Sequence, residues 1–225
     1  MMTRELVIAA YDRYLDWLDN INPEVKQTVY RKGNESSQRD NEIKIELNKG
    51  RCVHTFFNHI YTNYDNLSDI TFFAQDWPFD HWEDVVEVIN NGTEESRCQL
   101  KIGGYYGFHF NTITVPSLLG GTMWRLSPTN HHGTGNVLAC KSDGSPQDSN
   151  PNIDVDKYWS MFFEQVPPPA EYEFMPGGHF GITKQNAQLR SKEFYKKVAD
   201  FLLEEEVSPW IIERLECYIF NPNIK

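Results

Sequence analysis

The chain has 225 residues, of which 40% are apolar and 14% aromatic, so it can build a full hydrophobic core and the bulk of it is not expected to be disordered. Its 21 Lys and Arg against 32 Asp and Glu give a net charge of −11, which argues against a nonspecific nucleic-acid binder and against binding to an anionic membrane surface. No apolar run approaches the ~18–20 residues of a membrane span, and four cysteines without a CxxC pair favour reduced thiols in a cytosol-like compartment.

Strands and helices alternate at the start of the chain, and residues 34–50 read as a polar loop between them. Alternation of this kind is typical of a parallel sheet, so we expect an α/β fold with a central, mostly parallel sheet flanked by helices. The elements predicted in this part are a strand at 6–10, one or two helical turns at 14–18, a strand at 27–30, a helix at 52–64 and a strand at 69–74.

The remainder reads mainly as helix and loop. Residues 100–156 are rich in Gly, Asn and Pro, and they should form loops and short strands that could cover a site. Since no linker forces a domain boundary, we expect a single domain over residues 1–225. The other predicted elements are helices at 81–90, 156–166, 191–206 and 208–220, and a strand at 174–183 around the Gly177-Gly178 break.

Polar groups follow three of the predicted strands, namely Tyr11-Asp12-Arg13, Arg31-Lys32-Gly33 and Gln75-Asp76. Ligands of open α/β sheets bind beyond the carboxyl ends of the strands, so these groups should converge on a site if the strands are adjacent. Arg13, Arg31 and Lys32 would then offer positive charge to a diphosphate. The alternative is that these are ordinary polar loop ends.

Asp76 is delivered to a strand end by the apolar run before it, where its carboxylate could bind a hard divalent cation. Asp80 has a competing role, because Asp80-His81-Trp82-Glu83 has the spacing of a capping box and Asp80 could simply cap the next helix. His81 could contact a ligand or lie on the surface of the first helical turn.

Two later segments carry further candidate residues. His179 follows two glycines that permit close backbone approach to a ligand, although a turn with a hydrogen-bonded histidine explains the same pattern. Glu213 lies in an aromatic-rich helix, where its carboxylate could serve as a general base or pair with Arg214 or a neighbouring lysine.

Taken together, these segments resemble the GT-A-type glycosyltransferases, such as the amino-terminal glycosyltransferase domain of a larger chlorella-virus protein, and also a family of uncharacterised fungal and viral proteins with the same order of blocks. The resemblance spans about residues 6–220 and implies a GT-A-like, Rossmann-like sheet that binds a nucleotide sugar. The blocks that carry it are Val7–Asp12, Val29–Gly33, Phe73–His81 and Gly178–Ile182, followed by Arg190, Glu193–Tyr195 and Glu213–Leu215.

The resemblance also implies a divalent metal, Mn²⁺ or Mg²⁺, which GT-A enzymes usually hold with an Asp-x-Asp motif. Here Asp76-Trp77-Pro78 has no second acid, so Asp76 is the positional equivalent and Asp80 a candidate second ligand. Glu213 is the expected base if the sugar inverts its configuration. The candidate nucleotide-sugar-binding residues are Ala10, Tyr11, Arg13, Arg31, Lys32, Arg51, Gln75, Asp76 and His179.

These expectations describe a cytoplasmic enzyme, in the host cytoplasm if the chain is viral, that moves a glucose- or rhamnose-type sugar from a UDP-sugar to a glycan or glycoprotein acceptor. About residues 1–95 would bind the nucleotide and about 96–225 would bind the acceptor and complete the metal site. Further domains of a longer polypeptide could accompany the chain. The rival hypotheses are a carbohydrate-binding module without turnover and a metal-dependent hydrolase that uses Asp76, His81, His131 and His179.

Overall fold

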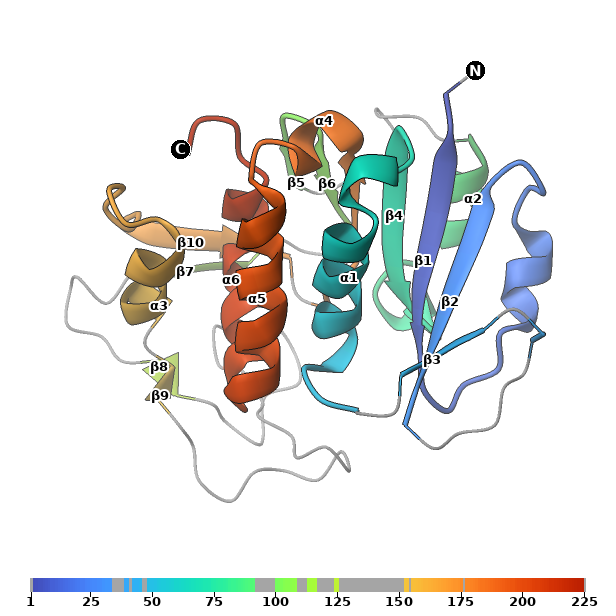
Figure 1. Ribbon diagram of the computed structural model, residues 1–225, viewed down its shortest axis with the longest axis horizontal. Coiled ribbons are helices and arrows are strands. Elements are labelled where there is room, and N and C mark those ends of the chain that lie inside the picture. The colour runs from blue at the N-terminus through green and yellow to red at the C-terminus, as the bar shows by residue number, and fades with distance from the viewer. Residues whose placement is uncertain are drawn as a thin grey trace.

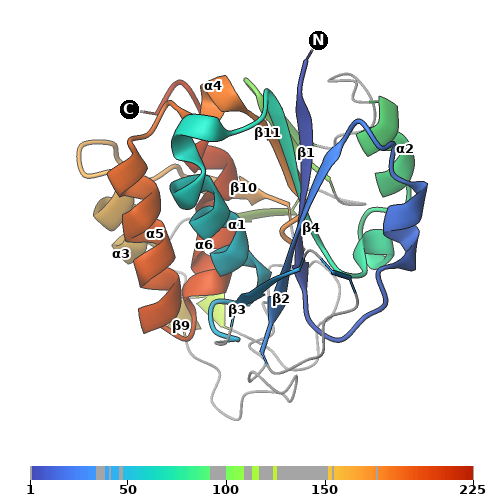
Figure 2. The same ribbon diagram turned by 45° about the vertical axis from the view of Figure 1, so that its right-hand side comes forward.

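The computed structural model describes residues 2–33, 39–40, 42–45, 48–91, 100–108, 113–116, 124–125, 152–153, 155–175 and 177–224. Within these residues, seven strands form one mixed sheet with helices on both of its faces (Figures 1 and 2). The chain therefore has the expected α/β architecture. The strands of this sheet are β1 (Arg4–Ala10), β2 (Lys26–Lys32), β3 (Ile43–Ile45), β4 (Ile70–Gln75), β5 (Leu100–Ile102), β6 (Tyr105–Gly107) and β11 (Phe180–Thr183).

The order of strands across the sheet is β3-β2-β1-β4-β11-β6-β5. The first four are parallel, with β1 at their centre hydrogen-bonded to both β2 and β4. The next strand, β11, is antiparallel to both β4 and β6, and β5 and β6 form an antiparallel pair. Strands from both halves of the chain thus enter one sheet, and its parallel half comes entirely from the first 75 residues.

Both faces of the sheet are buried, which explains why β1 reads as a continuous apolar run. Alternate residues of β1 point to opposite faces: Val7 and Ala9 belong to the core beneath α1, α5 and α6, whereas Leu6 and Ile8 belong to the core beneath α2 and the 3₁₀ turn η1. The helices are α1 (Arg51–Thr62), α2 (Val85–Asn91), α3 (Val155–Phe162), α4 (Lys184–Ala187), α5 (Lys192–Glu204) and α6 (Ser208–Ile219), with 3₁₀ turns η1 (Asp16–Asn20), η2 (Tyr64–Asn66) and η3 (Pro78–Asp80).

Two small antiparallel pairs, β7 with β10 and β8 with β9, lie outside the central sheet. Among the described residues, no helix is long and apolar enough to cross a membrane. Cys52 and Cys217, the two cysteines in the described ranges, are free thiols. The strands concerned are β7 (Ile113–Pro116), β8 (Trp124–Arg125), β9 (Asn152–Ile153) and β10 (Glu171–Phe174).

The helices and the first three strands that the sequence predicts are present to within a few residues. The single strand predicted at 174–183 is wrong, because β10 ends at Phe174 and β11 begins at Phe180 in a different sheet. Between them Gly177 and Gly178 adopt φ angles of 93° and 65°, which a strand does not accommodate. The short strand β3 lies within residues 34–50, which the sequence predicts as loop.

Candidate functional site

A cavity of about 330 Å³ lies at the carboxyl ends of β1, β2 and β4. The registers of the parallel pairs bring Ala10 beside Arg31 and Ala9 beside Gln75, so the segments that follow the three strands meet at one edge of the sheet. The convergence expected from the sequence is therefore present. The cavity is lined by Ala9, Ala10, Tyr11, Asp12, Arg13, Lys32, Asn48, Arg51, Cys52, Gln75, Asp76, Trp77 and Asp80.

Asp76 ties two of these segments together. Its Oδ2 accepts hydrogen bonds from the backbone N–H groups of Tyr11 (2.9 Å) and Arg13 (3.1 Å), and its Oδ1 accepts one from the N–H of Trp77 (3.0 Å). A carboxylate offers about four acceptor positions, so roughly one remains for a ligand. The carboxylate thus fixes the loop after β1, which forms one wall of the cavity.

The cationic residues after β2 differ in what they can reach. Arg31 is fully buried, and its guanidinium donates to both oxygens of Glu42, at 2.9 and 2.7 Å, and to the carbonyl of Tyr11 at 2.9 Å. It is not among the residues that line the cavity. Arg31 therefore holds the loop after β1 through the carbonyl of Tyr11 and does not face the cavity.

Lys32 lines the cavity but is only 2% exposed. Its Nζ donates to the carbonyl of Lys49 at 2.7 Å and to the carbonyl of Arg51, just before and at the start of α1. Burial lowers the pKa of this ammonium to about 8, because a charged group is costly to remove from water.

The exposed cations of the cavity are Arg13 and Arg51. The Arg13 side chain is 68% exposed, and its nearest acidic partner is Asp12 at 3.9 Å, a separation that leaves it free to turn toward a ligand. The Arg51 guanidinium lies 5.1 Å from the centre of the Trp210 ring. Two exposed aromatic side chains, Tyr11 (41%) and Trp77 (45%), also line the cavity.

Glu213 is linked to the site by a hydrogen bond from Gly177. Its Oε1 accepts a hydrogen bond from the N–H of Gly177 at 2.7 Å, and the carbonyl of Gly177 accepts one from Nε2 of Gln75 at 2.8 Å. Gln75 and Glu213 thus contact the same residue, Gly177, although Glu213 does not itself line the cavity. Burial raises the pKa of the Glu213 carboxyl, and the nearby Arg214 opposes that shift.

His179 follows this turn and is fully buried, with its ring 5.8 Å from that of His81. Neither histidine lines the cavity. His131, the remaining histidine of the hydrolase hypothesis, lies outside the described residues. The structure thus brings together nine of the eleven site residues named from the sequence in or beside one cavity, with Glu213 counted through its contact with Gly177; the buried Arg31 and His179 are the two that do not line it.

Asp76 and Asp80 could supply only a minority of the ligands of a metal ion. Asp80 is exposed and lines the same cavity as Asp76. In the described part of the chain, no group of three His, Cys, Asp or Glu side chains is placed to hold a metal. An ion bound here would therefore take most of its ligands from a substrate and from water, as Mg²⁺ commonly does.

Asn48 and Cys52, which the sequence patterns do not single out, also line the cavity, Asn48 from just before α1 and Cys52 from its first turn. The one available signal was Gly50, which precedes a helix in a segment that otherwise reads as loop. Burial raises the pKa of the Cys52 thiol to about 11, so this thiol stays protonated at neutral pH and is a poor nucleophile.

The fold and site define an α/β protein with a ligand-sized cavity at the carboxyl edge of its parallel strands, lined by cations, carboxylates and exposed aromatic rings. Over residues 6–223 the chain matches the family described as "Protein of unknown function (DUF3431)", and it belongs to that family. No curated protein and no solved structure matched it.

Proposed function

We propose that the protein is a glycosyltransferase that moves a sugar from a UDP-sugar to a hydroxyl of a glycan or glycoprotein acceptor. The observation that carries the proposal is the cavity itself, which gathers Arg13, Lys32, Arg51, Tyr11 and Trp77 at the carboxyl ends of three adjacent parallel strands. That edge is where open α/β sheets bind nucleotides. The parallel half of the sheet is also compatible with the GT-A-like fold that the sequence suggests.

The lining suits the two ends of a nucleoside diphosphate. The exposed rings of Tyr11 and Trp77 offer flat apolar surfaces on which a uracil base can stack. The exposed guanidinium groups of Arg13 and Arg51 can donate paired hydrogen bonds to phosphate oxygens. As the bond between sugar and phosphate breaks, negative charge grows on the leaving diphosphate, and cations beside the diphosphate stabilise that charge.

Glu213 is the proposed general base. The N–H of Gly177 holds its Oε1 in place, and burial raises its pKa toward the range in which a carboxylate accepts a proton well at neutral pH. In this role it would take the proton of the acceptor hydroxyl as that oxygen attacks the anomeric carbon. A carboxylate base of this kind belongs to a transfer that inverts the configuration of the sugar.

Asp76 and Asp80 are the residues that would hold Mn²⁺ or Mg²⁺ together with the diphosphate. A divalent ion bound there would supply further positive charge next to the leaving group. Since Asp76 already accepts three backbone hydrogen bonds, Asp80 would be the freer of the two ligands.

Calorimetric titration of UDP and of uridine, each with Mn²⁺ and with EDTA, tests the proposal. Tighter binding of UDP than of uridine, followed by release of UDP from one member of a UDP-sugar panel, would support a glycosyltransferase. Absence of UDP binding in both conditions would refute it. Cleavage of a phosphoester without nucleotide-sugar dependence would favour a hydrolase, and sugar binding indifferent to nucleotide would favour a binding module.

A further inference from the structure

The turn that begins α1 has an unusual backbone. Gly50 and Arg51 are both left-handed, with φ angles of 66° and 51°, and among the described residues Arg51 is the only non-glycine residue with a positive φ. A side chain at such an angle is strained, so the surroundings must over-determine the conformation. Strained residues of this kind cluster at functional sites, where a side chain must be held in one orientation.

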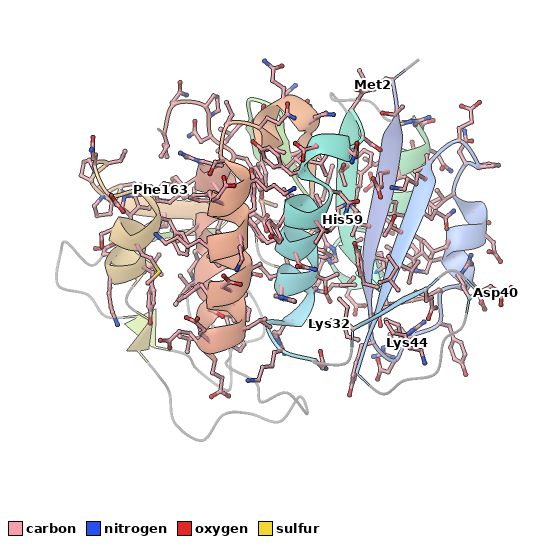
Figure 3. The ribbon with its side chains drawn as sticks, in the orientation of Figure 1. Met2, Lys32, Asp40, Lys44, His59 and Phe163 are labelled. Carbon is pink, nitrogen blue, oxygen red and sulfur yellow. The ribbon has the colours of Figure 1, made fainter. Side chains whose placement is uncertain are left out.

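Two contacts hold the turn. Nζ of Lys32 donates to the carbonyls of Lys49 and Arg51, which stand on either side of Gly50. Gly50 itself is packed so closely that a Cβ there would lie 2.5 Å from Cβ of His54 and 2.7 Å from the carbonyl oxygen of Leu202. Lys32 therefore fixes this turn from the side of the sheet, at the end of β2 and beside the start of α1 (Figure 3).

The turn places Arg51 on the wall between two cavities. One is the cavity at the ends of β1, β2 and β4, and the other, of about 320 Å³, lies between this turn and the connection from α5 to α6. Both are lined by Arg51 and Asn48, and the ring of Trp210 lies 5.1 Å from the Arg51 guanidinium. Arg51 is exposed, whereas Lys32 is 98% buried and has committed two of its three N–H donors.

We propose that Lys32 is a positioning residue that acts through Arg51: it fixes the turn at residues 49–51 so that the Arg51 guanidinium meets the diphosphate, and it does not itself contact phosphate. The inference rests on the proposed nucleotide site. It assigns different roles to Lys32 and Arg51, two cations of one cavity that charge alone does not distinguish.

A double-mutant cycle separates these roles. The dissociation constants of UDP and uridine are measured for wild type, Lys32→Met, Arg51→Met and the double variant, and the UDP preference is their ratio. Arg51→Met should lower this preference by about 10- to 100-fold, the usual effect of losing a charged hydrogen-bond partner. Lys32→Met should lower it by a similar factor, and the double variant should be no worse than Arg51→Met alone.

Independent, additive losses would overturn the proposal, because they would mean that Lys32 contacts phosphate itself. Equal losses for UDP and uridine in Lys32→Met would also overturn it, since a merely structural role weakens both ligands alike. Lys44→Met is the matched control: Lys44 is exposed on the neighbouring strand β3 and should leave the UDP preference unchanged (Figure 3).

A second measurement uses the wild-type protein alone, in case Lys32→Met does not fold. In NMR spectra that resolve side-chain N–H groups, UDP should shift the Nε–H signal of Arg51 relative to uridine and leave the Nζ signal of Lys32 in place. A diphosphate-dependent shift of Lys32 that exceeds the shift of Arg51 would overturn the proposal. If wild type shows no preference for UDP, the proposed function fails together with this inference, whereas an additive cycle in a protein that does prefer UDP refutes this inference alone.

Discussion

Gln75 and Glu213 hold the same glycine from opposite sides: Nε2 of Gln75 donates to the carbonyl of Gly177 at 2.8 Å, and the N–H of Gly177 donates to Oε1 of Glu213 at 2.7 Å. The first residue ends β4 and the second lies in α6, so the turn after β10 joins the floor of the cavity to the proposed base. The position of Glu213 therefore depends on the backbone of Gly177.

Gly177→Ala should be more harmful than Gly178→Ala, although both glycines have positive φ angles. A Cβ at Gly177 would lie 3.2 Å from two ring atoms of His81, whereas a Cβ at Gly178 would meet nothing closer than 3.9 Å. We expect the Gly177 variant to lose about 1–3 kcal/mol of unfolding free energy and the Gly178 variant about 1 kcal/mol. Urea unfolding of both variants measures the difference, and equal losses would contradict the role of this packing.

Glu213→Gln should retain UDP affinity and lose turnover. The amide still has an oxygen to accept the hydrogen bond from Gly177, but it cannot take a proton, and general bases typically contribute 10²–10⁴-fold. UDP release from the donor selected in the panel measures turnover, and calorimetry measures affinity. Turnover within a few-fold of wild type would remove Glu213 as the base.

The sequence predicted three of the four parallel strands, β1, β2 and β4, because each is a local apolar run followed by polar residues, and it missed the short strand β3. The same pattern located most of the cavity, since the carboxyl ends of neighbouring parallel strands must meet. It could not locate β11 between β4 and β6, because that pairing joins distant segments and is decided by packing. For the same reason it treated Arg31 and Lys32 alike, although alternation along β2 gives them different surroundings: Arg31 meets Glu42, and Lys32 meets the start of α1.

Arg31→Met should destabilise the protein by about 3–5 kcal/mol, because it removes the guanidinium that pairs with the fully buried side chain of Glu42. Replacing both residues, as in Arg31→Met with Glu42→Met, should recover much of that loss. Urea unfolding of the two variants and of Glu42→Met measures the coupling. Because Arg31 does not line the cavity, the UDP preference over uridine should survive in any variant that folds, and its selective loss would place Arg31 at the phosphate after all.

Asp76→Asn and Asp80→Asn should separate loop support from metal binding. An amide at position 76 can accept fewer of the three backbone N–H bonds, so the loop at residues 11–13 should loosen and UDP affinity should fall with Mn²⁺ and with EDTA alike. Asp80→Asn should lower UDP affinity only with Mn²⁺. Calorimetry under both conditions distinguishes the variants, and a loss restricted to Mn²⁺ in Asp76→Asn would show that its metal role outweighs its hold on the loop.

Two buried histidines of α1 should make the free energy of unfolding depend on pH in the acid range. Burial lowers the pKa of His54 and of His59 to about 4; His59 Nδ1 shares a hydrogen bond with the Tyr30 hydroxyl at 2.9 Å, and its Nε2 lies 3.6 Å from Glu5 (Figure 3 labels His59). In the unfolded chain both should titrate near pH 6.5. Between pH 6.5 and 4 the unfolded state then binds more protons than the folded state, so the free energy of unfolding falls as pH falls, by about 1.4 kcal/mol per unit for each histidine.

Urea unfolding at pH 4.5, 5.5, 6.5 and 7.5 measures this slope for wild type, His54→Gln and His59→Gln. Burial raises the pKa of Glu216 well above its usual value, and that carboxyl acts in the opposite direction, because its stabilisation is lost as pH rises through the acid range. Comparing each histidine variant with wild type removes this common contribution. In each variant the free energy of unfolding should change less steeply with pH than in wild type, by about 1.4 kcal/mol per pH unit, the contribution of one proton. A slope equal to that of wild type would mean that the replaced histidine is protonated in the folded protein.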